Sequence, residues 1–359
     1  MSESLCLADL PERIGALAGP DRERLERIFD VRLAAGSAVP PDAMADWIAR
    51  HFGSVDAVRR QTIVRVTNKV TGEGALFNQQ RANRPLQAAA GAGDSGAMIR
   101  ATEECLFCRP AEGTPADVFG RIRGRFCTTA SNAAKYDGWH AVIVFDEHDP
   151  LRFSLEQVED YVRTAQKWAR RAHRRDPEAR YPFFLWNCLW RSGASVIHGH
   201  AQMALARGMP YARIEAWRQA ALRYRAAHGS DYFADLVAVH DRLGLAIPHG
   251  DAVIFPSLTP AKEMETTVVA PRLEGGLVPA LYRVLRTFID RLGVQSFNAV
   301  LYQPPLAGAG EAWAGFPFAI RVLDRGSLEN RTSDIGSMEL FAQSVVVTDP
   351  YYVAEALRA

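Results

Sequence analysis

The sequence predicts an α+β fold: two copies of a unit that combines an antiparallel sheet with a helix, preceded by an N-terminal helical extension. Strand-like and helix-like segments occur twice in the same order, and two short stretches recur, AKYDGWHAVIV as AKEMETTVVA and HGHAQMAL as FPFAIRVL. A length of 359 residues also predicts about two domains. We place the boundaries so that 1–60 is the extension, 61–210 the first unit and 211–359 the second, degenerate unit.

Apolar residues of the extension recur at helical spacing, which predicts helices throughout 1–60. The two sets on one helix face are Leu25, Ile28 and Phe29, and, after two prolines, Met44, Trp47 and Ile48. The segment 62–76 then alternates between apolar and polar residues, which predicts a strand.

The first copy of the repeated pattern runs through a predicted strand pair at 124–145 and a helix that starts at Ser154. Ser154 and Gln157 have the spacing of a capping box at the start of a helix. The apolar face of this helix is Leu155, Val158, Val162, Ala165 and Trp168. Further strands are predicted at 181–186 and 195–206.

The second unit repeats this order with strands at 251–255 and 265–270, a helix, and strands at 296–302 and 316–323. The helix carries an apolar face of Val278, Leu281, Leu285, Phe288 and Leu292. Alignment of the repeats sets His198, His200 and Gln202 of the first unit against Phe316, Phe318 and Ile320 of the second. We therefore expect the polar chemistry to lie in the first unit alone. The alternative is two similar but independent sheets.

The composition is that of a soluble globular enzyme, with 48% hydrophobic and 23% charged residues. The 42 Lys and Arg nearly balance the 41 Asp and Glu, so no overall basic surface favours nucleic acid or an anionic membrane. A charged substrate must then be bound by a local cluster. Only five cysteines, no leader-like N-terminus and no stretch of about 18 apolar residues predict a cytoplasmic protein that does not span a membrane.

Two pairs of residues have the chemistry of metal ligands. Cys105 and Cys108 have the spacing of a zinc knuckle, although a redox pair or two buried thiols would show the same spacing. Two more ligands are needed, and His148 and His198 at the ends of predicted strands are the candidates.

His198, His200 and Gln202 alternate on a predicted strand, where such residues line one face. Burying three polar side chains without partners is costly, so this row predicts a functional site unless the strand is an exposed edge. The preceding Gly193-Ala-Ser195 predicts a tight turn whose backbone N–H groups and hydroxyl suit phosphate oxygens.

Taken together, Cys105-x-x-Cys108, His148, Asn187, Gly193-x-Ser195 and His198-x-His200-x-Gln202 resemble galactose-1-phosphate uridylyltransferase and its relatives in the histidine-triad superfamily. These relatives include the ATP adenylyltransferase and ADP-glucose phosphorylase branches. Upstream, Gln80-Arg81-Ala-Asn-Arg84-Pro85 resembles the arginine-containing substrate loop of the uridylyltransferases. The resemblance covers roughly residues 75–345 and implies two histidine-triad-like repeats.

The resemblance implies that His200 is the nucleophile, which attacks the α-phosphorus of a nucleotide to give a covalent nucleotidyl-histidine. An imidazole with the ordinary pKa of about 6.5 is largely neutral at pH 7, as a nucleophile must be. The resemblance also implies one structural Zn²⁺, held by Cys105, Cys108, His148 and His198.

Other residues take their roles from the same resemblance. Gln202 donates a hydrogen bond to a phosphate oxygen but cannot shuttle protons, which favours transfer to a phosphate acceptor over hydrolysis. Ser195, Asn187 and Gly193 would stabilise charge on the phosphoryl oxygens. Arg81 and Arg84 would clamp the distal phosphate, and Asn132 would contact the base or ribose unless it is an ordinary turn residue.

Two departures suggest a divergent branch. Gly199 stands where typical uridylyltransferases carry proline, and 297–302 contains no histidine for a second metal, so we expect one metal. His140 and His249 have no clear partners in the sequence. We therefore expect a nucleotidyltransferase that moves a nucleotidyl group from a nucleotide sugar or dinucleotide to a phosphorylated small molecule. The alternatives are a phosphorylase or hydrolase of such donors and a non-catalytic, zinc-stabilised nucleotide-binding protein. A homodimer is expected by resemblance alone.

Overall fold

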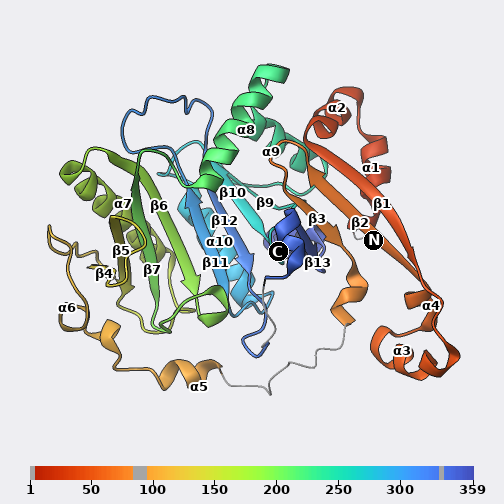
Figure 1. Ribbon diagram of the computed structural model, residues 1–359, viewed down its shortest axis with the longest axis horizontal. Helices are drawn as coiled ribbons and strands as arrows, with labels where there is room; N and C mark the ends of the chain where they lie inside the picture. Colours follow the sequence, from red (N-terminus) through yellow and green to blue (C-terminus); the bar gives the residue numbers. More distant parts are fainter. Residues whose placement is uncertain (1–4, 84–94, 331–334) are drawn as a thin grey trace.

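The computed structural model describes residues 5–83, 95–330 and 335–359. Within these residues the strands form a nine-stranded sheet and a four-stranded sheet, which lie side by side in Figure 1. Helices and strands are mixed along the chain, which confirms the predicted α+β class.

The nine-stranded sheet contains both predicted units. Its strands lie in the order β4 (Cys127–Ser131), β5 (Trp139–Phe145), β7 (His200–Arg207), β6 (Ala179–Cys188), β11 (Phe297–Tyr302), β12 (Phe318–Asp324), β10 (Thr266–Ala270), β9 (Ala252–Pro256) and β8 (Ile247–His249). The orders β4-β5-β7-β6 and β9-β10-β12-β11 are the same when each half is read from its outer strands inward. Antiparallel pairing of β6 with β11 joins the halves, so the two repeats form one sheet and not two independent ones.

One long helix connects the second and third strands of each repeat and packs on the sheet. These helices are α7 (Leu155–Arg175) and α10 (Leu277–Asp290), and they contact each other. The predicted capping box starts α7, since Ser154 accepts a bond from the Gln157 N–H and the Gln157 side chain accepts one from the Ser154 N–H. Tyr161 of α7 stacks on Phe145 of β5 with ring centroids 3.7 Å apart. Side chains alternate along a strand, so α7 covers the face opposite to that of Val144 and its neighbour His200.

The strand register corrects the alignment of the two repeats. Directly paired residues on neighbouring strands share a face, and Gln202 pairs with Leu185, Leu185 with Val300, and Val300 with Arg321. Arg321 therefore shares the face of Gln202, whereas Ile320 faces the helices. The expectation that Ile320 takes the place of Gln202 is wrong, because a shift of one residue moves every side chain to the other face.

The second repeat is also not purely apolar on this face. Arg321 is 6% exposed and donates to both carboxylate oxygens of the buried Glu265, at 2.6 and 3.0 Å, and to Glu73 at 3.0 Å. Its guanidinium lies 5.1 Å from the centroid of the Trp217 ring. The expectation that the second repeat carries only core residues at this position is therefore wrong, whereas the confinement of the active-site chemistry to the first unit stays a prediction. This ion-pair cluster fills the corresponding face of the second repeat.

The four-stranded sheet combines both ends of the chain. Its strands lie in the order β1 (Phe29–Ser37), β2 (Arg60–Asn68), β3 (Gly74–Phe77) and β13 (Gln343–Val346), with β13 parallel to β3. The prediction of helix throughout 1–60 is wrong for β1. Residues 29–33 alternate between apolar and polar side chains, a strand signal that was overlooked because Phe29 was assigned to the apolar face of a helix. The strand is largely exposed at the sheet edge and is held by backbone pairing with β2.

The predicted strand at 62–76 is divided between β2 and β3. Because β1 and β2 belong to one sheet, that sheet crosses the boundary placed at residue 60. The division at residues 60 and 210 stays a prediction.

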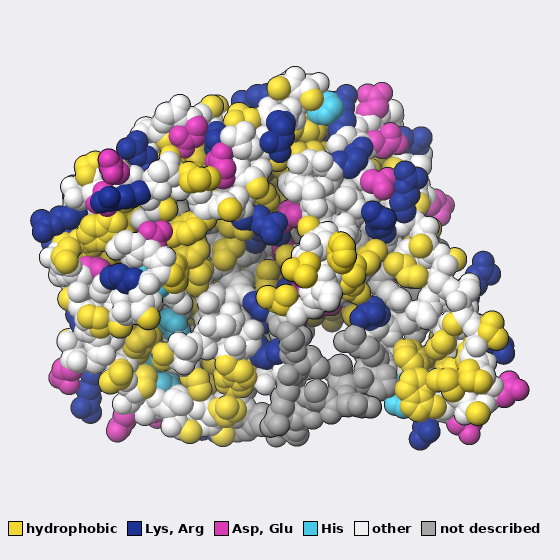
Figure 2. Space-filling model, viewed as in Figure 1, with side chains coloured by type: hydrophobic (Ala, Val, Ile, Leu, Met, Phe, Trp, Pro, Cys, Tyr) yellow, Lys and Arg dark blue, Asp and Glu magenta, His cyan; other side chains and the backbone are white. Residues whose placement is uncertain are grey.

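The remaining helices surround the two sheets (Figure 1). The α-helices are α1 (Leu10–Ala16), α2 (Gly19–Ile28), α3 (Ala45–Phe52), α4 (Val55–Arg59), α5 (Ser95–Arg100), α6 (Pro110–Gly113), α8 (Ala212–His228), α9 (Tyr232–Arg242) and α11 (Pro350–Arg358). The 3₁₀ turns are η1 (Leu7–Asp9), η2 (Asp42–Met44), η3 (Gln79–Asn83), η4 (Leu106–Cys108), η5 (Trp190–Ser192) and η6 (Ser337–Phe341). Figure 2 shows hydrophobic side chains gathered over the region of α3 and α4, where Met44 and Trp47 are exposed. Among the described helices, none has the length and apolar character needed to cross a bilayer.

The buried ion pair predicts a large stability difference. Arg321→Ala leaves the Glu265 carboxylate, 2% exposed, without its main cation, and should lower the free energy of unfolding by about 3–5 kcal/mol in urea titrations. Asp56→Ala removes the exposed pair with Arg59 and is the control, with an expected loss below about 1 kcal/mol. Equal losses in the two variants would contradict this account of the second repeat.

Candidate functional site

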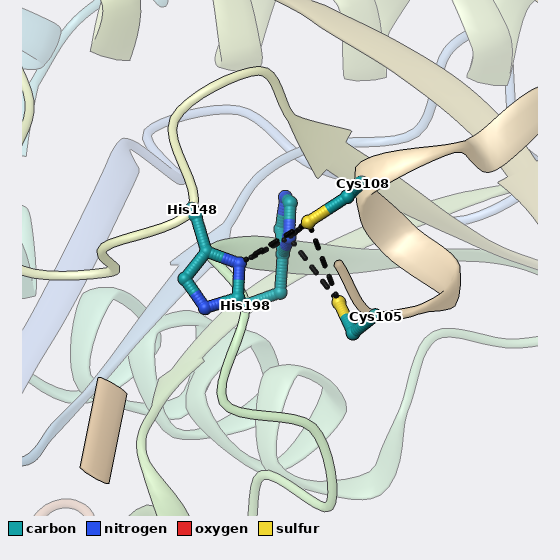
Figure 3. A group of neighbouring side chains, drawn as sticks. All are labelled: Cys105, Cys108, His148 and His198. Carbon is teal, nitrogen blue, oxygen red and sulfur yellow. Dashed lines mark hydrogen bonds between the residues drawn. The ribbon is translucent and has the colours of Figure 1, made fainter. Parts of the chain in front are cut away.

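The four candidate metal ligands come together from three segments of the chain. Cys105 precedes η4 and Cys108 ends it, and the turn between them is closed by the Cys108 N–H, which donates to the Cys105 carbonyl at 2.9 Å. His148 follows β5 and His198 precedes β7. The Gly199 N–H donates to the His148 carbonyl at 3.0 Å, which holds the two histidine segments together. Figure 3 shows the two sulfur atoms facing the two imidazoles.

The distances between donor atoms fit a tetrahedral ion. The two Sγ atoms are 3.8 Å apart, the close Sγ to Nδ1 distances are 3.4–3.5 Å, and the Nδ1 atoms of His148 and His198 are 3.0 Å apart. Ideal Zn–S and Zn–N bonds give tetrahedral edges of about 3.8 Å between sulfurs, about 3.6 Å between sulfur and nitrogen and about 3.4 Å between nitrogens. Among the described residues, this is the group of histidine, cysteine or acidic side chains that could hold a metal ion.

Hydrogen bonds fix both histidines in the form that a metal requires. The His198 Nε2–H donates to the Phe145 carbonyl at 2.8 Å, and the His148 Nε2–H donates to the Ile99 carbonyl at 3.1 Å. A carbonyl only accepts, so the ring protons lie on Nε2 and both Nδ1 lone pairs point toward the cysteines. Burial lowers the pKa of His198 to about 4, which keeps the ring neutral. Two facing lone pairs repel each other unless a cation lies between them.

Gly199 explains one departure from typical uridylyltransferases. Its N–H makes the bond to His148, which proline could not make. A Cβ at this position would lie 2.8 Å from the Phe145 ring and 3.0 Å from the Glu147 carbonyl. The close approach of these segments therefore requires glycine.

His200 has the opposite ring orientation to that of His198. It is 5% exposed, and its Nδ1–H donates to the His198 carbonyl at 2.8 Å, which leaves the lone pair on Nε2. Burial lowers the pKa of His200, so the imidazole is neutral at pH 7. The structure begins β7 at His200 and not at Ser195 as predicted, so the side chain of His198 turns to the cysteines while His200 and Gln202 share the sheet face.

Phe107 connects the cysteine turn with the candidate nucleophile. It lies between Cys105 and Cys108, and its ring meets those of His200 and His198 edge-on, with centroids 5.4 and 5.9 Å apart. It also packs against the cluster of Ala130, Val142 and Val144. A metal ion that holds the cysteine turn in place would therefore also hold the Phe107 ring in place beside His200.

Two side-chain amides on the same face are held by their carbonyl oxygens. Gln202 Oε1 accepts from His140 Nε2 at 2.9 Å, and Asn187 Oδ1 accepts from Asn298 Nδ2 at 2.6 Å. Asn298 Nδ2 also donates to the Ser192 carbonyl at 3.0 Å, and Arg325 donates to Asn298 Oδ1. Sequence reasoning missed Asn298 because it searched 297–302 for histidines alone. The signal was a polar residue within an apolar strand.

The turn before β7 uses most of its own backbone donors. Gly193 adopts a left-handed conformation with φ of 92°, and its N–H donates to the Trp190 carbonyl at 3.0 Å. The Ala194 N–H donates to the Leu189 carbonyl at 3.3 Å. Gly193 therefore supplies the shape of the turn, and Ser195 is exposed beside it. The roles of Gly193 and Ser195 toward phosphate stay predictions.

The other predicted substrate contacts are Asn132, Arg81 and Arg84. Asn132 Oδ1 accepts from the Ala134 N–H at 3.0 Å, as in a turn, and its amide nitrogen lies 3.2 Å from His140 Nε2. Arg81 is exposed on η3, which directly follows β3 of the four-stranded sheet, whereas β7 belongs to the nine-stranded sheet. Arg84 lies outside the described residues. The substrate roles of all three residues stay predictions.

The cluster predicts a specific loss of metal. Cys105→Ser replaces a thiolate with a poor zinc ligand, so the purified variant should lose the roughly one Zn²⁺ per chain expected for a closed site and should melt at a lower temperature. Cys6→Ser is the matched control, because Cys6 lies outside this cluster and its side chain caps η1, a position where serine is also a good cap. Elemental analysis that finds the same zinc content in both variants would contradict the site.

Solved structures with a similar fold are known, although no family model matches the sequence. No curated protein matches it either. An ADP-glucose phosphorylase from Arabidopsis thaliana with bound ADP-glucose superposes with a TM-score of 0.63 at 14% identity, covering 81% of this chain and 97% of that one. A GalT-like protein from Arabidopsis thaliana gives 0.58 at 15% identity, covering 71% and 92%.

A uridylyltransferase gives a TM-score of 0.56 at 18% identity, covering 82% of this chain and 97% of that one. The chain therefore has the fold of the ADP-glucose phosphorylase and the uridylyltransferase, which confirms, at the level of the fold, the resemblance that its motifs indicate.

Proposed function

We propose that this protein is a nucleotidyltransferase that works through a covalent nucleotidyl-His200 intermediate. The observation that carries the proposal is the state of His200: a buried, neutral imidazole whose Nδ1–H is held by the His198 carbonyl and whose Nε2 lone pair is free for attack. Gln202 and Asn187 on the same sheet face are amides and not bases. This combination suits attack on a phosphoryl group.

In the first step, His200 Nε2 attacks the α-phosphorus of the donor. The N–P bond forms as the bond from phosphorus to the bridging oxygen breaks, and the leaving phosphate takes that electron pair. The proton on Nδ1 stays in its bond to the His198 carbonyl, which stabilises the positive charge on the ring. In the second step, a phosphate oxygen of the acceptor attacks phosphorus and the electron pair returns to Nε2.

Gln202 supports transfer over hydrolysis. A water nucleophile must lose a proton during attack, and an amide cannot accept it. A phosphate acceptor is already ionised and needs no base. The amide N–H groups of Gln202 and Asn187 would stabilise the negative phosphoryl oxygens. Ser195 and the turn at Gly193 would assist them, with Arg81 and Arg84 on the distal phosphate.

We further propose that Cys105, Cys108, His148 and His198 hold one Zn²⁺ with a structural role. When bound, the ion supplies charge to keep the thiolates and imidazoles together, and no reacting atom needs to touch it. The five cysteines are all unpaired, as suits the reducing cytoplasm that we propose for this protein.

The solved structures of the same fold support a nucleoside diphosphate sugar as donor, because one is an ADP-glucose phosphorylase with bound ADP-glucose and another a uridylyltransferase. The former favours a second candidate, a phosphorylase whose acceptor is inorganic phosphate. The two candidates share the first step and differ only in the acceptor.

The proposal predicts a trapped intermediate. Incubation with UDP-glucose, ADP-glucose, ATP or diadenosine tetraphosphate without acceptor should add one nucleotidyl group, seen by intact mass, and an acceptor should remove it. His200→Asn should abolish the adduct, while His228→Asn, an exposed position at the end of α8, should keep it. An adduct on His200→Asn, or none with any donor on the wild-type chain, would refute the mechanism.

A further inference from the structure

We propose that His140 is a positioning residue that turns the Gln202 amide so that its N–H groups, and not its carbonyl, face the phosphoryl group of the substrate. The inference rests on the proposed function and adds a residue that neither the sequence motifs nor the mechanism above assign. His140 lies on β5 and shares the sheet face of Gln202 on the neighbouring strand.

The proton on His140 is placed by its backbone neighbour. The Tyr136 N–H points at His140 Nδ1 from 3.3 Å, so Nδ1 must accept and the ring proton lies on Nε2. Two atoms lie near His140 Nε2: Gln202 Oε1 at 2.9 Å and the Asn132 amide nitrogen at 3.2 Å. With the proton on Nε2, the ring donates to Gln202 Oε1, the nearer atom and an acceptor, and makes no hydrogen bond with the Asn132 amide group, which is itself a donor. If the Gln202 amide were rotated by 180°, its own N–H groups would face the His140 Nε2–H and repel it. The amide nitrogen is therefore directed away from His140, over the face that carries His200.

The surroundings keep His140 in this state. The side chain is 1% exposed, and the Tyr136 ring lies over it with centroids 3.6 Å apart. The Lys135 ammonium donates to the His140 carbonyl and to Ser131 Oγ, both at 2.7 Å, which fixes the local backbone. Burial lowers the pKa of His140 and Lys135 lowers it further, against the hydrogen bond to Gln202, so the ring stays neutral.

The direction of the amide decides what Gln202 can do. A phosphoryl group presents only acceptor oxygens, so a carbonyl facing it repels and an amide N–H attracts. Asn187 shows the same arrangement, since Asn298 holds its carbonyl oxygen and leaves its N–H groups to a ligand. Two amides held by their oxygens on one face make a site for negatively charged oxygen.

The test compares two substitutions of His140. Phenylalanine keeps a ring under Tyr136 but has no donor, whereas glutamine can place an amide N–H near the former Nε2. His140→Phe should slow adduct formation in single turnovers by about 10- to 100-fold, within the range for loss of one preorganised donor. His140→Gln should restore the rate to within about 3-fold of wild type. Equal rates for the two variants would overturn the inference.

A double-mutant cycle separates positioning from general damage. If His140 acts through Gln202, then His140→Phe should have an effect below about 2-fold in a Gln202→Ala background. If His140 had only a structural role, His140→Phe would slow adduct formation by the same factor in the wild-type and the Gln202→Ala backgrounds. That multiplicative result would overturn the inference even if His140→Phe is slow.

The affinity of the same variants for AMP and UMP is also measured by calorimetry. This second readout distinguishes failure of the inference from failure of the proposed function. Without any adduct on the wild-type chain the proposed mechanism fails, but weaker nucleotide binding by His140→Phe, absent in the Gln202→Ala background, still supports the positioning role. Unchanged affinity overturns the role. A wild-type chain that binds neither nucleotide overturns both.

Discussion

The antiparallel pairing of β6 with β11 is the constraint on which the rest of the structure depends, because it turns two repeats into one sheet with one register. Through this pairing, Gln202 and Arg321 stand in the same cross-strand row, while α7 and α10 share the opposite face. The polar side chains of this row have different partners in the two repeats. Arg321 is neutralised by buried carboxylates and is not available to a ligand. In the first repeat the amide N–H groups of Gln202 and Asn187 remain for a ligand. The hydrogen bond between Asn298 and Asn187 runs from β11 to β6, the two strands that join the repeats.

Backbone carbonyls set the chemistry of the two neighbouring histidines. The Phe145 carbonyl takes the Nε2 proton of His198, so that ring offers Nδ1 to the cysteine cluster. The His198 carbonyl takes the Nδ1 proton of His200, so this ring offers Nε2 to the open face. Two residues of one type, separated by a glycine, thus act as a metal ligand and as a candidate nucleophile. Phe107 touches both rings, which couples the order of the metal site to that of His200.

Local patterns predicted the order of elements in the two repeats but not β1, and the contacts across the sheet depended on register. The spacing of apolar residues and the Ser154 cap predicted α7, and the repeated segments predicted two equivalent halves. The four metal ligands followed from a family resemblance, and the structure brings them within 4.8 Å. The contacts of His140 with Gln202 and of Asn298 with Asn187 could not be predicted, because strand pairing decides which residues face each other. The same limit explains why Ile320 was aligned with Gln202 in place of Arg321.

The most direct test of the account is to locate the nucleotidyl group on the chain. After incubation with a donor, the protein would be digested under mildly alkaline conditions, since a phosphoramidate bond is labile in acid, and the peptides sequenced by fragmentation mass spectrometry. We predict the group on His200, and on neither His198 nor His148, whose nitrogens are committed to backbone carbonyls and to the metal site. A group attached to any residue other than His200 would contradict it.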